Sequence, residues 1–437
     1  MESMVLKMRK MKDSGIEWIG EIPEGWEISK VSYFYEVQLG KMLQPQKKSE
    51  TDTEEKYLCA ANVGKNSLSL DTLKTMWFSQ TEKHQFDLKE GDLLVVEGGD
   101  VASCAIIETP IRNLFFQNAL HRVRPLHNES VAFLRYWLMT AKSYGYIDLI
   151  CNKATIAHFS KEKFIALPIL VIPQDIQSKI VSFLDLECKQ IDDLLSKSRS
   201  SIEEYKKLKQ AVITQAVTKG VRGKREMKDS GVEWIGKIPA EWSICPLKRL
   251  AAIQTGCTPS KTSSESFYSS IAGTPWIKPD NLGFSSSIET TAEFLTEEGC
   301  SVARILPSNT VYVGCIGSRI GNCGYSLIPC ACNQQINALI FNARMYWKYG
   351  WYLTIFQEEQ YMLLANGNVI QIINSTTQGN ISCIVPSISE QKEIVDYLDA
   401  KCAEIDRLIA KKEKMVKELE SYKKSLIYEV VTGKREV

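Results

Sequence analysis

Cysteine and histidine are the side chains in this sequence best suited to bind a metal ion, but their spacing does not form a site. The 437 residues include thirteen cysteines and four histidines. No Cys-x-x-Cys pair occurs, and the nearest group is Cys323, Cys330 and Cys332. The histidines all lie in the first half of the chain, at His84, His121, His127 and His158. Structural zinc sites usually combine two close ligand pairs, so we predict no metal site and expect reduced, mostly buried cysteines.

Sequence signatures of catalysis are also missing. The chain has no Asn-Pro-Pro-aromatic or Asp-Pro-Pro-aromatic segment of an adenine methyltransferase, no GxGxxG fingerprint and no GxxxxGK[ST] phosphate loop. Pro279-Asp280 is not followed by the Glu-x-Lys that a nuclease-like centre would need. The glycine-rich stretch 314–324 lacks the lysine of a nucleotide cradle, so it fits turns and close approach of another molecule better. We predict that the chain has no catalytic residues of its own.

Charge and hydropathy indicate an ordinary soluble protein. Lysine and arginine number 53 against 52 acidic residues, and 44% of the residues are hydrophobic. This balance gives no support for a basic nucleic-acid-binding domain, although a local basic surface stays compatible with it. The most apolar run, Phe164 to Pro173, contains two prolines and is too short to span a bilayer, which needs about 20 residues. No apolar segment of a secretory signal follows the basic N-terminus, so we predict a cytoplasmic protein.

The elements that must position any functional side chains occur twice. Residues 11–26 read MKDSGIEWIGEIPEGW and residues 227–242 read MKDSGVEWIGKIPAEW, at an offset of 216. A second pair of segments, Gln177 to Thr218 and Gln391 to Thr432, is related by an offset of 214. An internal repeat at a fixed period indicates a repeated architecture. We call 11–26 and 227–242 the tryptophan motifs.

The second repeated segments have the pattern of long helices. They lack glycine and proline over about 40 residues, and apolar residues recur at heptad-like spacing. One inner position is predicted at Ile191, Tyr205 and Val212 in the first copy and at Ile405, Leu419 and Leu426 in the second. The other is predicted at Leu194 and Leu208 and at Leu408, Met415 and Tyr422, with Ile202 and Val416 on a flanking stripe. Because Ser198 and Ser201 occupy inner positions, each helix needs a partner; the alternative is two amphipathic helices that pack only on their own domains.

Between these elements lie two variable segments, from about Ser29 to Ile172 and from Ser243 to Val385. Their sequences differ strongly, but landmarks persist: Gln38-Leu39-Gly40 corresponds to Gln254-Thr255-Gly256. Each later contains an amide-bearing stretch, Gln117-Asn118 and Asn333-Gln334-Gln335. Short β-branched runs broken by glycine and asparagine predict mainly-β domains, with a helix at 131–143 in the first. The fold class is therefore α+β.

A constant frame that holds two divergent inserts resembles the DNA-specificity subunits of type I restriction-modification systems. The twice-occurring DSG-[IV]-EWIG-x-IP-x-x-W phrase resembles their conserved regions, as do the proline-to-glutamine entries Pro173–Gln177 and Pro386–Gln391 that open the helices. The resemblance covers about Met11 to Glu436. It implies four segments: a first target-recognition domain at 11–172, a helix at 173–218, a second recognition domain at 219–385 and a helix at 386–432.

The resemblance also implies a function and partners. Each recognition domain would read one half of a bipartite, asymmetric site on double-stranded DNA. The helices would pair as an antiparallel coiled coil in a pseudo-twofold, near-circular arrangement, and their length would set the unread spacer. Two modification subunits would methylate adenines and restriction subunits would cleave. S-adenosylmethionine, ATP and Mg²⁺ are expected on those partners, with no cofactor in this chain.

Candidate DNA-binding residues follow from residue type and from position beside glycine-rich turns. Arginine and lysine read guanine, and asparagine and glutamine read adenine, while phosphates accept hydrogen bonds from many polar groups. The candidates are Lys41, Gln44, Asn62, Gln117, Asn118 and Arg122 in the first domain and Lys278, Asn281, Ser318, Arg319, Gln334 and Gln335 in the second. Asparagine and glutamine near turns also bond their own backbone, and the matching positions of Asn62 and Asn281 favour a shared turn.

Other interpretations remain open from sequence. Trp18, Ile19 and Trp26, with their copies Trp234, Ile235 and Trp242, fit a core role or a docking site for the modification subunits. For the whole chain, a coiled-coil scaffold without a DNA role and a self-contained methyltransferase or nuclease are the alternatives. A solitary specificity subunit from an inactive locus is a third.

Overall fold

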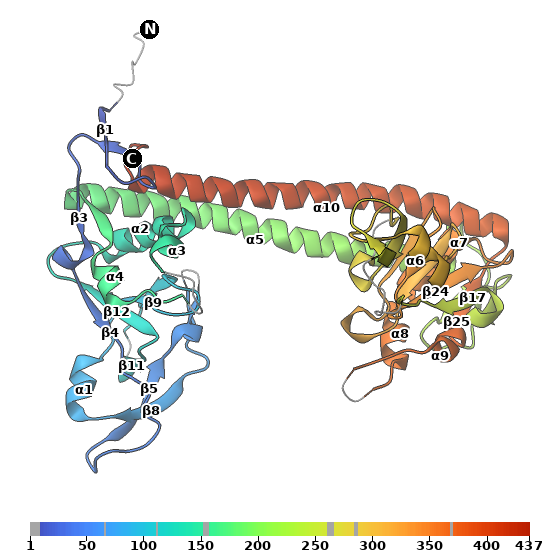
Figure 1. Ribbon diagram of the computed structural model, residues 1–437, viewed down its shortest axis with the longest axis horizontal. Helices are drawn as coiled ribbons and strands as arrows, with labels where there is room; N and C mark the ends of the chain where they lie inside the picture. The colour runs from blue at the N-terminus through green and yellow to red at the C-terminus, as the bar shows by residue number, and fades with distance from the viewer. Residues whose placement is uncertain are drawn as a thin grey trace, which may run out of the picture. The chain divides into compact units, whose positions relative to one another are not determined.

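The computed structural model describes residues 9–64, 67–110, 112–151, 157–259, 266–283, 287–367 and 370–437. It divides into two compact units, each of which contains one variable domain and a part of each long helix (Figure 1). Unit 1 comprises Met1–Lys197 with Met415–Val437, and unit 2 comprises Ser198–Lys414. The units therefore cut across both helices, so that each unit holds one variable domain with the helix segments next to it.

Two sheets build the first variable domain in unit 1. One has the strand order β10-β9-β12-β4, and the other has the order β11-β5-β8 with β11 parallel to β5. The bounds are β4 Tyr35–Leu39, β5 Thr53–Leu58, β8 Lys74–Phe78, β9 Leu93–Val96, β10 Cys104–Ile106, β11 Leu114–Phe116 and β12 Leu120–Pro125. A small hairpin pairs β6 Val63–Gly64 with β7 Ser67–Leu68. The prediction of a mainly-β domain is confirmed here.

The central strand β9 explains how this domain buries both faces of its larger sheet. Side chains alternate between the faces of a strand. Leu93 and Val95 belong to one apolar cluster, which includes the tryptophan motif and the long helices. Leu94 and Val96 belong to a second cluster, packed with side chains of the three-stranded sheet such as Phe116. The smaller sheet is thus held on the face of the larger sheet that points away from the helices.

The second variable domain repeats this architecture in unit 2. Its sheets have the orders β22-β21-β24-β17 and β18-β20-β19-β23, with β19 parallel to β23. The bounds are β17 Ala251–Thr255, β18 Tyr268–Ser269, β19 Thr274–Ile277, β20 Phe294–Leu295, β21 Thr310–Gly314, β22 Cys323–Ser326, β23 Ala331–Cys332 and β24 Ile336–Phe341. In β21, Val311 and Val313 face one cluster and Tyr312 faces another. Two divergent sequences therefore encode one fold.

Short helices and edge strands connect each variable domain to the frame. The predicted helix at 131–143 is α2, Val131–Ser143. The other elements in unit 1 are β3 Glu27–Lys30, α1 Gln80–Gln85, α3 Tyr146–Ile150, α4 Lys161–Ile165 and β13 Pro168–Val171. Those in unit 2 are β16 Ser243–Pro246, α6 Glu297–Val302, α7 Trp347–Phe356, α8 Glu358–Leu364, α9 Ser375–Gly379 and β25 Ser382–Val385. The β13–β3 and β25–β16 pairs close each domain just before its long helix begins.

The two long helices form as predicted. They are α5, Gln174–Lys219, and α10, Ile388–Val431. Both begin directly after or close to a proline, Pro173 and Pro386, and continue without an internal glycine or proline that would interrupt the backbone hydrogen bonds. Figure 1 shows α5 and α10 as the longest elements of the chain.

Ion pairs fix the relative direction of the helices within each unit. In unit 1, Lys423 of α10 bonds both carboxylate oxygens of Asp192 of α5, at 2.6 and 2.7 Å. In unit 2, Lys209 of α5 bonds Asp406 of α10 at 2.8 Å. Within unit 1, Arg435, which follows α10, also lies over the Phe183 ring of α5, and within unit 2, Arg222, which follows α5, pairs with Glu393 of α10. In each unit the partner numbers rise on one helix as they fall on the other, so α5 and α10 run antiparallel there. The offset of 214 converts the first pair into the second, as twofold-related contacts require.

The buried stripes of the helices correct the predicted heptad assignment. Ile191 and Ile405 are buried, as predicted, and so is Ser198. The second predicted position is wrong: Leu194, Leu208, Leu408, Met415 and Tyr422 are 38–51% exposed. The side chains that turn inward are one residue further along, at Leu195 and Ile202. The error arose because leucines at heptad spacing, such as Leu194 and Leu208, are typical of a helix core. The stripe that is buried instead contains polar side chains such as Lys209, so its apolar pattern is weaker in the sequence.

Each tryptophan motif forms a small hairpin against a helix end. The hairpins are β1 Met11–Asp13 with β2 Glu21–Pro23, and β14 Met227–Asp229 with β15 Lys237–Pro239. Trp26 and Trp242 are almost fully buried, and Ile19 and Ile235 are buried in the same clusters. Trp18 and Trp234 are partly buried against those clusters. The core role of the motifs is confirmed, and a docking role stays a prediction.

A glycine ends each long helix and makes room for the motif's tryptophan. Gly220 and Gly433 have φ values of +75° and +73°, a conformation common at helix C-termini. A Cβ atom on Gly433 would lie 2.7 Å from the ring of Trp26, and one on Gly220 would lie 3.1 Å from the ring of Trp242. In unit 1 a further contact ties the tryptophan motif to α10: the hydroxyl of Tyr428 donates to the Ile19 carbonyl at 2.9 Å.

The thirteen cysteines fit the predicted role as small apolar side chains. Ten are buried, and Cys59, Cys257 and Cys300 are partly buried. Within the described ranges, no group of three or more metal-binding side chains comes together. No helix in the same ranges is long and apolar enough to cross a membrane. Residues 1–8, on which part of the N-terminal prediction rests, lie outside the described residues.

Candidate nucleic-acid interface

In the first variable domain a glycine holds one loop directly against an amide-bearing turn. The loop follows β4 at Gly40, and the turn between β11 and β12 contains Gln117 and Asn118. The Lys41 N–H donates to the Phe116 carbonyl at 3.0 Å, and the Asn118 N–H donates back to the Lys41 carbonyl at 2.9 Å. A Cβ atom on Gly40 would lie 2.3 Å from the Gln117 carbonyl oxygen. Only glycine permits this approach.

The second variable domain has the same arrangement at positions 216 residues later. The Cys257 N–H donates to the Cys332 carbonyl at 3.0 Å. A Cβ atom on Gly256 would lie 2.2 Å from the Asn333 carbonyl oxygen. Each domain thus presents a glycine loop and an amide turn at one place, while the side chains that follow the glycine differ. We call these places the first and second loop–turn sites (residues 40–44 with 117–118, and 256–258 with 333–335).

Two candidates in the first loop–turn site, Lys41 and Gln44, point inward. Lys41 and Gln44 are 5% and 6% exposed. The Lys41 ammonium donates to Gln44 Oε1 at 2.8 Å and pairs with Glu82, and Gln44 Nε2 donates to Asp52 at 3.2 Å. Their polar groups are therefore used inside the domain.

The carboxylates of this network are held in the charged form. Backbone N–H donation from Lys48, with further bonds from Ser49 and Gln44, outweighs burial and lowers the pKa of Asp52 below its ordinary value. Burial raises the pKa of Glu82, but hydrogen bonds from Lys41 and Ser79 outweigh it, and the net pKa is lowered. A charged, fully bonded network of this kind makes the loop rigid.

Asn62 and Arg122 are also buried and bonded internally. Asn62 Oδ1 accepts the backbone N–H of Cys59 at 2.9 Å, and Asn281 Oδ1 accepts that of Lys278 at 2.9 Å in the second domain. This confirms the shared turn that their matching positions indicate. Arg122 donates to the carbonyl oxygens of Gln85 and Asp87 at 3.1 and 2.8 Å. DNA reading by these side chains would require the loss of such bonds.

The exposed surface of the first loop–turn site comes from other residues. Gln117 and Asn118 are partly exposed, and their side chains form no hydrogen bond within the described part of the chain. Met42 and Leu43 are 76% and 53% exposed. This apolar pair is not among the candidates predicted from sequence, all of which have hydrogen-bonding side chains. The signal in the sequence is two consecutive apolar residues after Gly40-Lys41.

In the second domain most candidates lie at the surface. Gln334 is exposed, and its Oε1 accepts the hydroxyl of Thr258. Gln335 is partly buried and accepts the side-chain amide of Asn333 at 3.1 Å. The remaining candidates lie on neighbouring turns: Ser318 is exposed, exposed Arg319 pairs with Asp280 at 3.3 Å, and Lys278 pairs with Glu293 at 2.8 Å. DNA contact by any of the twelve candidates stays a prediction.

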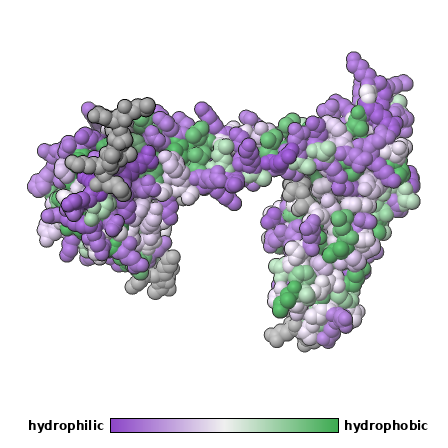
Figure 2. Space-filling view, turned by 90° about the horizontal axis from the view of Figure 1, so that it is seen from above, coloured by the Kyte–Doolittle hydropathy of each residue, from purple (hydrophilic) through white to green (hydrophobic). Residues whose placement is uncertain are grey.

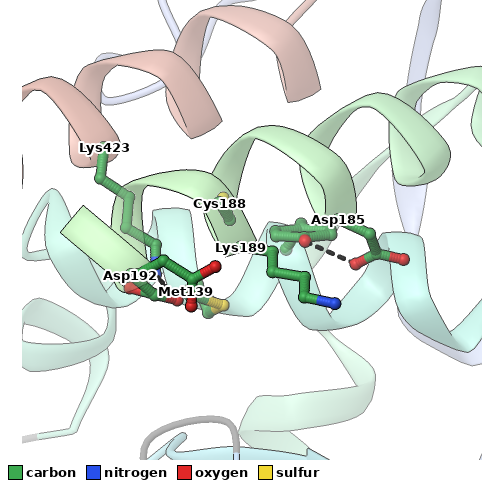
Figure 3. A pocket seen from close by; sticks show the side chains of 8 residues that line it. Met139, Asp185, Cys188, Lys189, Asp192 and Lys423 are labelled. Carbon is green, nitrogen blue, oxygen red and sulfur yellow. Dashed lines mark hydrogen bonds and ion pairs between the residues drawn. The ribbon is translucent and has the colours of Figure 1, made fainter. Parts of the chain in front are cut away.

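A cavity of about 230 Å³ lies where α2 meets α5 and α10 in unit 1 (Figure 3). It is lined by Tyr136, Met139, Asp185, Cys188, Lys189, Asp192, Asp193 and Lys423. The Tyr136 hydroxyl donates to Asp185 at 2.7 Å. Burial raises the pKa of Tyr136, which keeps the hydroxyl protonated. In unit 2, Tyr352 donates to Asp399 at 2.8 Å. This tyrosine–aspartate bond is therefore common to both copies, whereas the exposed side chains of the two loop–turn sites differ.

Comparison with known proteins assigns the chain to a family. The model of the type I restriction modification DNA specificity domain matches residues 23–204 and again residues 239–418. The chain belongs to this family. Similar proteins include two from Methanocaldococcus jannaschii: the type I restriction enzyme MjaVIII specificity subunit and the putative MjaX specificity subunit. Each is 24% identical, over 99% and 95% of this chain and 98% and 95% of the relative.

A solved structure supports the fold. A chain from a study of complex assembly and conformational transition of the type I R-M system superposes with a TM-score of 0.72. It has 13% sequence identity, and the match covers 94% of this chain and 98% of the other. The specificity subunit role is thereby shown, as is the α+β fold with two recognition domains. Specificity subunits are non-catalytic, and the catalytic activities of these systems lie in partner subunits.

Proposed function

We propose that each variable domain reads one half of a bipartite, asymmetric site on double-stranded DNA through its loop–turn site. The observation that carries this proposal is the pair of loop–turn sites. In both, the close glycine and the backbone bond from the next residue to the strand before the amide turn are shared, but Met42 in the first corresponds to Thr258 in the second. A shared fold with different surface groups at one place fits two readers of different sequences.

The long helices fit the role of a spacer. With 46 and 44 residues and about 1.5 Å of rise per residue, α5 and α10 are each about 65–70 Å long. One heptad inserted into each helix would add about 10 Å, which is about three base pairs of B-DNA at about 3.4 Å per base pair. The unread spacer should therefore lengthen by about three base pairs, while both half-sites stay the same.

The proposed partners are two modification subunits and, in the complex that cleaves DNA, restriction subunits. Identical partners need equivalent surfaces, and the repeat supplies them. In unit 1 the half-exposed Leu194 and Tyr422 lie next to the Asp192–Lys423 ion pair along the helices. In unit 2 the corresponding residues are Leu408 and Leu208. Figure 2 shows apolar patches among the charged residues along these helices.

The partners would carry the cofactors: S-adenosylmethionine for adenine methylation, and ATP and Mg²⁺ for restriction. This chain would bind none of these cofactors. It would act in the cytoplasm, where the DNA is. The tryptophan motifs would then act as core elements that keep the helix ends in place for those partners.

The test is to co-express the chain with the modification subunit of its own locus and to map methylated adenines across the host DNA. The expected result is a bipartite asymmetric motif with a fixed unread spacer. Exchange of residues 243–375 for those of another specificity subunit should change one half of that motif only. A single continuous motif would mean that one variable domain does not read DNA. No methylation by a folded, partner-bound complex would refute the proposal.

A further inference from the structure

The most unusual surface feature of the first loop–turn site is an apolar pair between two buried polar residues. Met42 and Leu43 are 76% and 53% exposed, while the flanking Lys41 and Gln44 are 5% and 6% exposed. This is the inverse of the usual pattern, in which charged residues face water and apolar residues face the core. Because the ammonium group of Lys41 is buried while the side chain of Met42 is exposed, we expect the exposed apolar side chains to contact another molecule.

The loop is held rigidly in this inverted arrangement. The Lys41 ammonium bonds Gln44 and Glu82, and Asp52 accepts Gln44 Nε2 and the backbone N–H groups of Lys48 and Ser49. The Trp77 N–H donates to the Gln44 carbonyl at 3.1 Å. Because both flanks are fixed, the apolar pair is presented without the entropy loss that a mobile loop would suffer on binding.

The surroundings of the pair suit contact with a nucleic acid. The turn of Gln117 and Asn118 is hydrogen-bonded to Lys41 and offers side-chain amides next to the apolar groups. Lys47 and Lys48 follow on the same loop with exposed side chains, and Lys47 forms an ion pair with Glu50. An apolar surface with amides and cations beside it matches a base edge flanked by phosphates.

We propose that Met42 and Leu43 contact the 5-methyl group of a thymine in the first half-site, and that Lys41 and Gln44 are positioning residues. Thymine alone presents a methyl group in the major groove. At the matching place the second domain presents the Thr258 hydroxyl bonded to Gln334, a polar surface suited to hydrogen bonding. The inference rests on the proposed function and adds the chemical group that the first domain recognises.

The test uses the complex with its modification subunits and a duplex that contains the mapped site. Each thymine of the first half-site is replaced in turn by deoxyuridine, which lacks only the methyl group. One replacement should weaken binding by the wild-type complex roughly fourfold, the value for one buried carbon. The double variant Met42→Ala, Leu43→Ala should bind the thymine and uracil duplexes equally, and uracil in the second half-site should have the same effect on both proteins.

The matched control is Leu149→Ala in α3, because this leucine is 75% exposed, close to the 76% of Met42. It should keep the wild-type preference for thymine. Lys41→Met should reduce that preference without changing recognition of the second half-site, whereas a merely structural role would weaken binding to both duplexes equally.

Three results would overturn the inference while leaving the proposed function intact. The double variant could keep the thymine preference, no thymine of the first half-site could be sensitive to uracil, or 2-aminopurine placed at that half-site could brighten on binding. The last result would indicate a wedge inserted between bases. If the wild-type complex methylates no site at all, the proposed function itself fails, and the inference fails with it.

Discussion

Substitution of Gly40 by alanine tests whether the loop–turn contact is needed for reading. A Cβ atom there would lie 2.3 Å from the Gln117 carbonyl oxygen and 2.8 Å from the Phe116 ring. Ordinary contacts begin near 3.4 Å, so the loop and the turn must separate by about 1 Å. That movement breaks the backbone hydrogen bonds of Lys41 with Phe116 and Asn118.

The magnitude follows from these contacts. Overpacking costs about 1–3 kcal/mol, and the two lost hydrogen bonds add about 1 kcal/mol each, which gives about 3–5 kcal/mol in total. At about 2–4 °C per kcal/mol for a unit of this size, the Tm of unit 1 should fall by about 6–20 °C. The matched control is Gly25→Ala, because a Cβ atom on Gly25 meets nothing within 4 Å; its effect should stay within about 0.5 kcal/mol.

Two assays separate stability from reading. Differential scanning calorimetry gives the Tm, and methylation mapping of the co-expressed complex at a permissive temperature gives the site. Gly40→Ala should relax the first half-site and leave the second unchanged. Equal behaviour of Gly40→Ala and Gly25→Ala in both assays would refute the idea that the close approach matters.

Three further predictions concern stability. Burial lowers the pKa of His121 below its ordinary 6.5, so the unfolded chain binds a proton at this imidazole more readily than the folded chain does. The free energy of unfolding should therefore fall as the pH drops through about 6.5. A calorimetric Tm that does not change with pH in this range would contradict this prediction. Glu390→Ala should destabilise unit 2 by about 3–5 kcal/mol in urea unfolding, because buried Glu390 accepts the Trp242 indole N–H at 2.9 Å and forms an ion pair with Arg225. Lys423→Ala should lower stability by less than about 1 kcal/mol, because its partner Asp192 is 53% exposed; a loss above 2 kcal/mol would disagree.

The frame could be predicted from the sequence because local rules determine it. The helices α5 and α10 follow from the absence of glycine and proline and from the repeated apolar spacing, and α2 was placed at its observed bounds. The correspondence of Gly40 and Gly256 was also visible, since a close backbone approach accepts only glycine. These features depend on residues close together in sequence or on identity between the two copies.

The side-chain directions could not be predicted, because they depend on contacts distant in sequence. Lys41 and Gln44 look like surface readers until Glu82 and Asp52 are placed beside them. The leucine ladder that begins at Leu194 looks like a coiled-coil core until the antiparallel partner is in register. In both cases the sequence shows whether the side chain is polar or apolar, but it does not show which distant residues surround that side chain in the fold.

The two copies differ in what they keep, and that difference separates two kinds of site. The Tyr136–Asp185 bond and the Asp192–Lys423 pair recur at equivalent positions of the other copy. The loop–turn sites keep the glycine and one backbone bond but change the exposed group from Met42 to Thr258. A surface that meets two identical partners must stay the same in both copies, whereas a surface that meets two different DNA sequences must differ. On the proposed function, the features that recur in both copies fit the part of the chain that serves two identical partners, and the exposed groups that differ fit the two surfaces that read different DNA sequences.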